Sequence, residues 1–182
     1  MSDTAPAQTP LTFTFDLGNA PKTVDVPGGT IQEAKRSDFS ALQDVAIFLL
    51  TLEGGALRVP HWHPDAGELD YVISGNATIG LAAPDGTPAS VAPQWQTLSV
   101  GPGQLAFLPR GWYHYIQNAS PTEPLQMLVI FTNAEPSDIG IAEAFSGTPA
   151  ALLAQTFGVG ASTFQGLQFG NTYIAAAPGT SR

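Results

Sequence analysis

The chain has 182 residues, of which 43% are hydrophobic, and this length and composition suit a single domain with one sizeable core. Its 15 acidic and 6 basic residues give a net charge of −9, which repels phosphate backbones and anionic lipid surfaces, so we expect neither a nucleic acid nor a membrane as partner. Cysteine is absent, which excludes disulfides and thiolate ligands, so any metal must be bound by nitrogen and oxygen.

The sequence shows no targeting or membrane-spanning signal and divides into three predicted parts. The N-terminus MSDTAPAQTP lacks the basic start and apolar run of a secretory signal, and no apolar stretch approaches the ~20 residues that span a bilayer. We therefore expect a soluble, cytoplasmic protein. The predicted organisation is a flexible arm over residues 1–10, a barrel over residues 11–134, and a helical extension with a frayed tail over residues 135–182.

Short β-prone runs follow one another through the barrel region, separated by turn-forming clusters such as PGG, SGN, PDG and GPG. Ten strands without intervening helices are typical of an antiparallel sandwich or barrel. The expected strands are residues 11–15, 22–26, 45–52, 56–62, 69–73, 77–81, 97–100, 105–108, 112–117 and 125–132.

The C-terminal part of the chain favours helices instead. Ser137 is placed to cap a short helix that runs to about Phe145. Thr148 and Pro149 form a suitable N-cap and first turn for a second helix, ALLAQTF, which Gly158 would end. We expect both helices to pack outside the barrel.

The stretch PHWHPDAGE contains two of the three histidines of the chain. Alternate side chains of a strand share a face, so His61 and His63 can bind one ion together. The turn-forming PDAG lets the chain return antiparallel and brings Glu68 to the same face, and His114 lies on another expected strand. Three imidazoles and one carboxylate suit manganese, iron, nickel, copper or zinc and leave positions open for a substrate. Spacing alone leaves a second interpretation open, two ordinary strand histidines without an ion.

Two longer motifs resemble the signatures of the cupin superfamily. Residues 55–75 read GALRVPHWHPDAGELDYVISG and match G-x5-H-x-H-x4-E-x6-G, and residues 103–118 read GQLAFLPRGWYHYIQN and match G-x5-P-x-G-x2-H-x3-N. The matching positions are Gly55, His61, His63, Glu68, Gly75, Gly103, Pro109, Gly111, His114 and Asn118. The resemblance implies an all-β, antiparallel jelly-roll barrel with a metal ion inside, bound by the three histidines and Glu68.

The first motif is also similar to the same region of oxalate decarboxylases, where an arginine three residues before the first histidine is followed by HWHP. The stretch FTNAEPSDIGIAEAFSGTPAALLAQTFGV is similar to the segment after the second cupin domain of those two-domain enzymes. The chain thus resembles a single-cupin relative over about residues 12 to 168. The resemblance implies manganese as the ion, a small carboxylate as the substrate, Arg58 as its contact, and a homodimer or higher homo-oligomer.

Strict strand alternation from His61 puts Arg58 on the opposite face, so a role in the pocket requires a bulge or kink near Pro60. The alternative is an arginine on the outer surface. Asp70, two residues from Glu68, is expected either to hold a histidine N–H beside the metal or to be an exposed strand residue. The aromatic residues near the motifs are expected to pack on the barrel, with one of them a candidate for the pocket mouth. They are Trp62, Tyr71, Trp112, Tyr113 and Tyr115.

Two departures from the decarboxylase pattern concern proton transfer, which needs a donor and an acceptor close to the substrate. The connection after the last barrel strand is short, and Glu135, its one glutamate, precedes a proline and does not match the glutamate of the family's mobile loop. Val129 stands where the second-domain pattern has a glutamate.

Three interpretations follow. The ligand set and Arg58 favour a manganese-dependent, oxalate decarboxylase-like enzyme or a cupin dioxygenase. The missing carboxylates favour a non-catalytic metal-binding, ligand-binding or storage-type cupin. The third interpretation is a jelly-roll scaffold whose site binds no metal.

Overall fold

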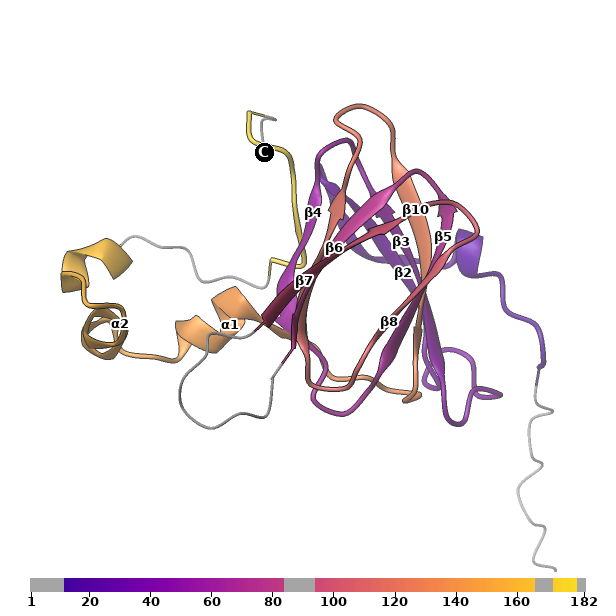
Figure 1. Ribbon diagram of the computed structural model, residues 1–182. Coiled ribbons are helices and arrows are strands. Elements are labelled where there is room, and N and C mark those ends of the chain that lie inside the picture. Colours follow the sequence, from indigo (N-terminus) through magenta and orange to yellow (C-terminus); the bar gives the residue numbers. More distant parts are fainter. Residues whose placement is uncertain (1–11, 84–93, 166–171, 180–182) are drawn as a thin grey trace, which may run out of the picture.

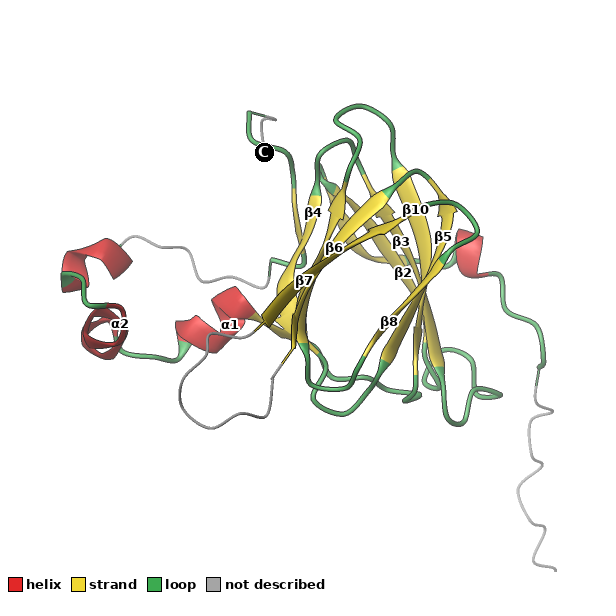
Figure 2. Ribbon diagram, in the orientation of Figure 1, coloured by secondary structure: helices red, strands yellow, loops and turns green. Residues whose placement is uncertain are grey.

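Two β-sheets that face each other form the body of the protein, as Figures 1 and 2 show for the computed structural model, which describes residues 12–83, 94–165 and 172–179. The first sheet has the strand order β1-β2-β3-β10-β5-β8. The second has the order β11-β4-β9-β6-β7, and β12 also pairs with β4. Neighbouring strands in this part of the chain are antiparallel, so the expected all-β jelly roll is confirmed.

The strands of the first sheet are β1 (Lys22–Val26), β2 (Gly29–Ala34), β3 (Ala46–Leu52), β10 (Leu125–Phe131), β5 (Glu68–Ser74) and β8 (Leu105–Leu108). Those of the second are β11 (Ile139–Gly140), β4 (Leu57–Trp62), β9 (Tyr113–Asn118), β6 (Ala77–Ala83), β7 (Gln94–Val100) and β12 (Ile174–Ala175).

The interior of the barrel contains polar as well as apolar side chains. Side chains alternate between the two faces of each strand, so every second residue points inward. The buried positions of β10 are Leu125, Met127, Val129 and Phe131. Those of β9 are His114, Ile116 and Asn118. The same packing that forms the core therefore also carries polar groups into it.

Asn118, the last residue of the second motif, is hydrogen-bonded to the backbone around it on several sides. Its side-chain amide donates to the carbonyls of Leu52, Glu53 and Glu123 at 3.0, 3.0 and 2.8 Å. Its side-chain oxygen accepts the N–H of Ser120 at 3.0 Å. An amide is needed here because only this side chain offers donors and an acceptor from one planar group.

Nine of the ten expected strands are present, with ends that differ by up to three residues. The expected strand at residues 11–15 is wrong: residues 12–15 are irregular and lead into a 3-10 helix, η1 (Leu17–Asn19), and residue 11 lies outside the described residues. Strand β2 was not predicted either. Its first residue, Gly29, looks like part of a turn, yet its φ of +144° and the 2.0 Å between an added Cβ and the Thr51 carbonyl oxygen require glycine within the strand.

The C-terminal helices begin later than expected. Helix α1 (Ile141–Ser146) starts after Gly140, because the preceding residues are still paired with β4 in β11. Ser137 does not cap it: its N–H and hydroxyl donate to the Asp65 carboxylate at 2.9 and 2.7 Å. Helix α2 (Ala150–Phe157) has Pro149 as N-cap, without a cap from Thr148.

Gly158 ends α2 in the left-handed conformation, as expected. Figure 1 shows both helices outside the barrel, where α1 packs against β4 and β11, and α2 against the short helix η2 (Ala161–Phe164). Neither helix of the described chain has the length and apolar character that crossing a membrane requires.

Candidate metal centre

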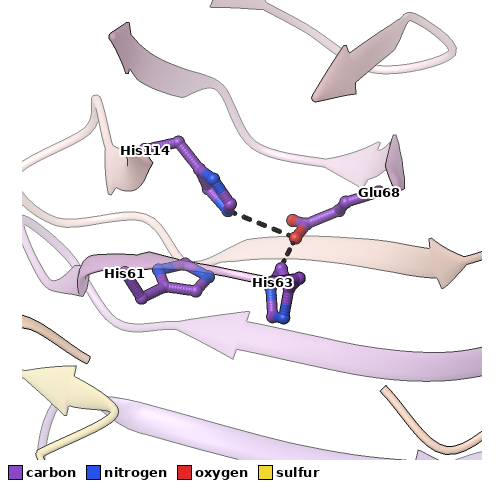
Figure 3. Close-up of side chains that lie close together, drawn as sticks. All are labelled: His61, His63, Glu68 and His114. Carbon is purple, nitrogen blue, oxygen red and sulfur yellow. Dashed lines mark ion pairs between the residues drawn. The ribbon is translucent and has the colours of Figure 1, made fainter. Parts of the chain in front are cut away.

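Four polar side chains meet inside the barrel (Figure 3). His61 lies on β4, His63 follows directly after it, Glu68 begins β5, and His114 lies on β9. One ligand atom from each residue lies within 4.8 Å of the others, and all four residues are buried. Of the two interpretations of the histidine pair, the structure therefore favours a common site.

Strand register explains why the four residues meet. His61 lies opposite His114 in the β4–β9 ladder, so their rings meet edge to face at a centroid distance of 4.2 Å. The chain turns after His63, whose carbonyl accepts the N–H of Gly111 at 2.9 Å. This link holds the second motif against the first, and Gly111 has the positive φ of +78° that the turn needs.

Hydrogen bonds of the imidazole rings determine which nitrogen is free. The Nδ1 atoms of the three histidines lie 2.7, 2.7 and 2.8 Å from backbone carbonyl oxygens. The carbonyls belong to Val59, Ser137 and Trp112. A carbonyl can only accept, so each Nδ1 carries the proton and each neutral ring presents the lone pair of its Nε2.

Glu68 makes this arrangement suitable for a cation. Its Oε2 lies 2.9 Å from His63 Nε2 and 3.2 Å from His114 Nε2 (Figure 3, dashed lines). With neutral rings these contacts place lone pairs against a carboxylate oxygen, which requires a proton or a metal ion between them. The three buried atoms have no ordinary hydrogen-bond partner among the described residues. The donor set therefore fits a divalent ion of the manganese to zinc series.

The pKa shifts of the site residues also favour a bound cation. Burial raises the pKa of Glu68, but the neighbouring His114 and His63 outweigh burial and hold it well below its usual value. Burial lowers the pKa of His63, yet its close contact with Glu68 and the charge of that carboxylate raise the pKa overall. Burial, with Arg58 and His114 nearby, keeps the pKa of His61 well below its usual value. Without an ion, a proton on His63 compensates the charge of Glu68.

Asp70 fits neither of its two expected roles. It is not an exposed residue, because its side chain is fully buried on the same face of β5 as Glu68. It does not hold a histidine N–H either, since the Nδ1 atoms donate to backbone carbonyls. Burial and the charge of Glu68 raise its pKa well above the usual range, so Asp70 is an uncharged neighbour of Glu68.

Arg58 lies in the interior, which overturns the alternative of an outer-surface arginine. The β4–β9 register is irregular between Arg58 and His61, and this irregularity includes Pro60, where the kink was required. The guanidinium forms an ion pair with Asp138, donates to the Tyr173 carbonyl at 3.2 Å, and lies 5.3 Å from the centre of the Tyr173 ring. Arg58 is only 5% exposed.

A cavity of about 320 Å³ joins Arg58 to His61, His63 and Glu68. Its other polar residues were missed by sequence analysis. They are Thr23 and Glu33 with Lys35, which stand on or next to β1 and β2, and Asp138 and Tyr173, which precede β11 and β12. No local pattern marks them, because pairing with distant strands brings these segments to the cavity.

The expected departures are visible in the same cavity. Val129 lines it, so an apolar side chain stands where the decarboxylase pattern has a glutamate. Glu135 is not among the lining residues and accepts the Ser37 N–H at 2.7 Å. None of the five aromatic residues considered for the mouth lines the cavity; its aromatic residues in the described chain are Phe48, Phe131 and Tyr173.

Comparisons with known proteins agree with the fold and the motifs. The chain is 29% identical over 166 residues to a probable oxalate decarboxylase of Arthroderma benhamiae, covering 90% of this chain and 39% of that protein. It is 31% identical over 134 residues to the oxalate decarboxylase OxdC of Bacillus subtilis, covering 74% of this chain and 32% of that protein. A germin-like protein of Arabidopsis thaliana is 25% identical over 154 residues, covering 81% of this chain and 67% of that protein.

A solved structure of Bacillus subtilis oxalate decarboxylase shares the fold, with a TM-score of 0.82 and 24% identity over 97% of this chain and 44% of that one. The chain thus spans well under half the length of the decarboxylases it matches. The profile of the family described as Cupin matches residues 15–165. The protein therefore belongs to the cupin family.

Proposed function

We propose that the protein is a metal-dependent enzyme that acts on a small carboxylate, with manganese as its ion. The observation that carries this proposal is the single cavity shared by the buried histidine–glutamate cluster and the buried Arg58. A cluster of neutral imidazoles with one carboxylate binds a cation, and a guanidinium beside it binds an anion. The oxalate decarboxylases among the relatives support a small carboxylate as the substrate class.

In this proposal, different residues bind the metal ion and the substrate. His61, His63, Glu68 and His114 hold the ion, which supplies Lewis-acid polarisation of substrate oxygens when bound. Arg58 donates hydrogen bonds to the carboxylate and orients it. The buried wall of the cavity excludes water, which strengthens both interactions.

Proton transfer falls to carboxylates that sequence analysis did not identify. Asp138 and Glu33 line the cavity, and both are paired with a cation, Arg58 and Lys35 respectively. Asp138 is the better candidate because its Oδ1 is buried without a hydrogen-bond partner in the described chain, whereas the Glu33 Oε1 accepts the Thr23 hydroxyl at 2.9 Å. A carboxylate with a free oxygen can accept a proton and return it.

A non-catalytic metal- or ligand-binding cupin is the second candidate. Two observations favour it: Val129 adds no acid to the cavity, and Arg58 is already paired with Asp138. A cupin dioxygenase uses the same ligand set, so oxygen consumption belongs in the same assay. A cytoplasmic location and a homodimer or larger assembly stay predictions.

The test begins with the metal content and activity of the purified protein. We expect about one manganese per chain and turnover of a small carboxylate, with oxalate, followed by carbon dioxide and formate release, and monocarboxylates assayed side by side. Arg58→Ala should abolish turnover, and Arg110→Ala, at an exposed arginine outside the cavity, should retain it. Full metal occupancy without turnover or oxygen consumption would support the binding protein.

A further inference from the structure

We infer that the substrate is a monocarboxylate with an apolar body, and that Asp138 determines this specificity by excluding a second carboxylate. The inference rests on the proposed function and adds the substrate class. Three properties of the cavity carry it: its size, its apolar wall and its charge.

The cavity is larger than a two-carbon dicarboxylate needs. Its volume of about 320 Å³ lies within the range of pockets that enclose small organic ligands, roughly 300 Å³ and more. A ligand that occupied only the space between the metal cluster and Arg58 would leave the remainder of the cavity unfilled. The unfilled part borders β2 and β3, on the sheet opposite β4 and β9.

Apolar side chains make up most of that remaining wall. Ile31, Phe48, Leu50, Ile116, Val129 and Phe131 belong to it, and apart from the partly buried Phe48 all of them are buried core residues. These side chains cannot donate a hydrogen bond to a second carboxylate, and the one cation that the described residues place on this side, Lys35, is already paired with Glu33, so burying a further charge there is costly. A hydrocarbon or aromatic group gains free energy there in proportion to the area it buries.

The charges in the cavity suffice for one anionic group. Its carboxylates are Glu33, Glu68 and Asp138, and its cations are Lys35 and Arg58. Lys35 lies 2.5 Å from Glu33, and Arg58 is paired with Asp138, so each cation is already compensated. A divalent ion held by Glu68 and neutral histidines adds one net positive charge, which a monocarboxylate cancels. A dicarboxylate would introduce an uncompensated negative charge.

Asp138 contributes the negative charge that disfavours a second carboxylate in the cavity. One of its oxygens pairs with Arg58, and the other is buried without a partner in the described chain, so it repels a further carboxylate. The segment before it is fixed, because Ser137 donates twice to Asp65 and its carbonyl accepts the His63 Nδ1–H at 2.7 Å. Asp138 is therefore held next to the metal cluster and cannot withdraw without breaking these contacts.

Three ligands separate the two parts of the inference: acetate, hexanoate and adipate. Hexanoate adds an apolar chain to acetate, and adipate adds a second carboxylate to a chain of the same length. For the manganese-loaded protein, isothermal titration calorimetry should show that hexanoate binds at least about tenfold more tightly than acetate, because four methylenes become buried. Hexanoate should also bind at least about tenfold more tightly than adipate.

Variants assign each preference to its residues. Asp138→Asn should narrow the difference between hexanoate and adipate and leave the difference between hexanoate and acetate. Val129→Thr replaces an apolar side chain of the wall by a polar one of similar size. It should narrow the difference in affinity between hexanoate and acetate and leave the difference between hexanoate and adipate. Circular dichroism verifies that each variant is folded. If a variant does not fold, the affinities of the wild-type protein for the three ligands decide the inference.

The outcomes distinguish the inference from the proposed function. If adipate or acetate binds the loaded protein as tightly as hexanoate, the inference is overturned and the proposed function remains. An unchanged hexanoate-to-adipate ratio in folded Asp138→Asn overturns the role of Asp138. If none of the three carboxylates binds, the proposed function fails as well.

Discussion

Breaking the ion pair between Arg58 and Asp138 should destabilise the fold as well as the activity. The two side chains are 6% and 22% exposed, so removal of either leaves a charge in a largely dry environment. Losing one partner of a buried pair costs about 3–5 kcal/mol. The partial exposure of Asp138 places this pair at the lower end of that range.

Arg58→Met also removes the hydrogen bond to the Tyr173 carbonyl and the contact with the Tyr173 ring. These contribute about 1 kcal/mol and about 0.5–1 kcal/mol. We therefore expect Arg58→Met to lower the free energy of unfolding by about 4–5 kcal/mol. Asp138→Asn should cost somewhat less, because its amide still accepts from the guanidinium.

Urea unfolding of the metal-free protein measures the effect in a double-mutant cycle. The double variant Arg58→Met/Asp138→Asn has no charge left to bury, so its loss should be smaller than the sum of the single losses by about 1–3 kcal/mol. Strictly additive losses, or a loss below about 1 kcal/mol for Arg58→Met, would refute a buried, coupled pair. The cycle also matters for function, because a loss of turnover in Arg58 variants then contains a structural part.

Three further perturbations test other parts of the structure. Asn118→Asp should cost about 3 kcal/mol or more in urea unfolding, since it turns an acceptor toward three backbone carbonyls that now receive a hydrogen bond; a loss under about 1 kcal/mol would contradict this. Burial lowers the pKa of His63, but Glu68 raises it overall, so the ion pair stabilises the metal-free protein fully below about pH 6.5 and less as the pH rises through the raised value. Glu68→Gln should therefore lose more stability at pH 6 than at pH 9, and an equal loss would be the contrary result. Gly80→Ala should cost about 1–3 kcal/mol, because an added Cβ would lie 2.1 Å from the Tyr115 ring, and Tyr115→Ala in the same chain should restore most of it.

The motifs allowed the candidate site to be predicted because its ligands are tied to strand periodicity. His61 and His63 share a face by alternation, and His114 meets them through the β4–β9 register. The spacing of glycine and proline around them marks the turns that let these strands approach. Local sequence therefore carried both the jelly-roll fold and the four residues of the cluster.

Residues that reach the cavity through non-local pairing could not be predicted in this way. Asp138 arrives because β11 pairs with β4, and Tyr173 because β12 pairs with the same strand from the end of the described chain. Glu33 was missed together with β2, whose opening glycine looks like a turn. The two carboxylates of the decarboxylase pattern remain absent, but segments outside both motifs bring other carboxylates, Glu33 and Asp138, to the cavity.

The central claim is that His61, His63, Glu68 and His114 bind one metal ion. Elemental analysis of the wild type and of His114→Ala, both purified and equilibrated with manganese under the same conditions, tests it most directly. We predict about one ion per chain in the wild type and none in the variant, with the fold retained in circular dichroism. Equal metal content in the two proteins would contradict the claim, because the chain has no further histidine to replace the lost ligand.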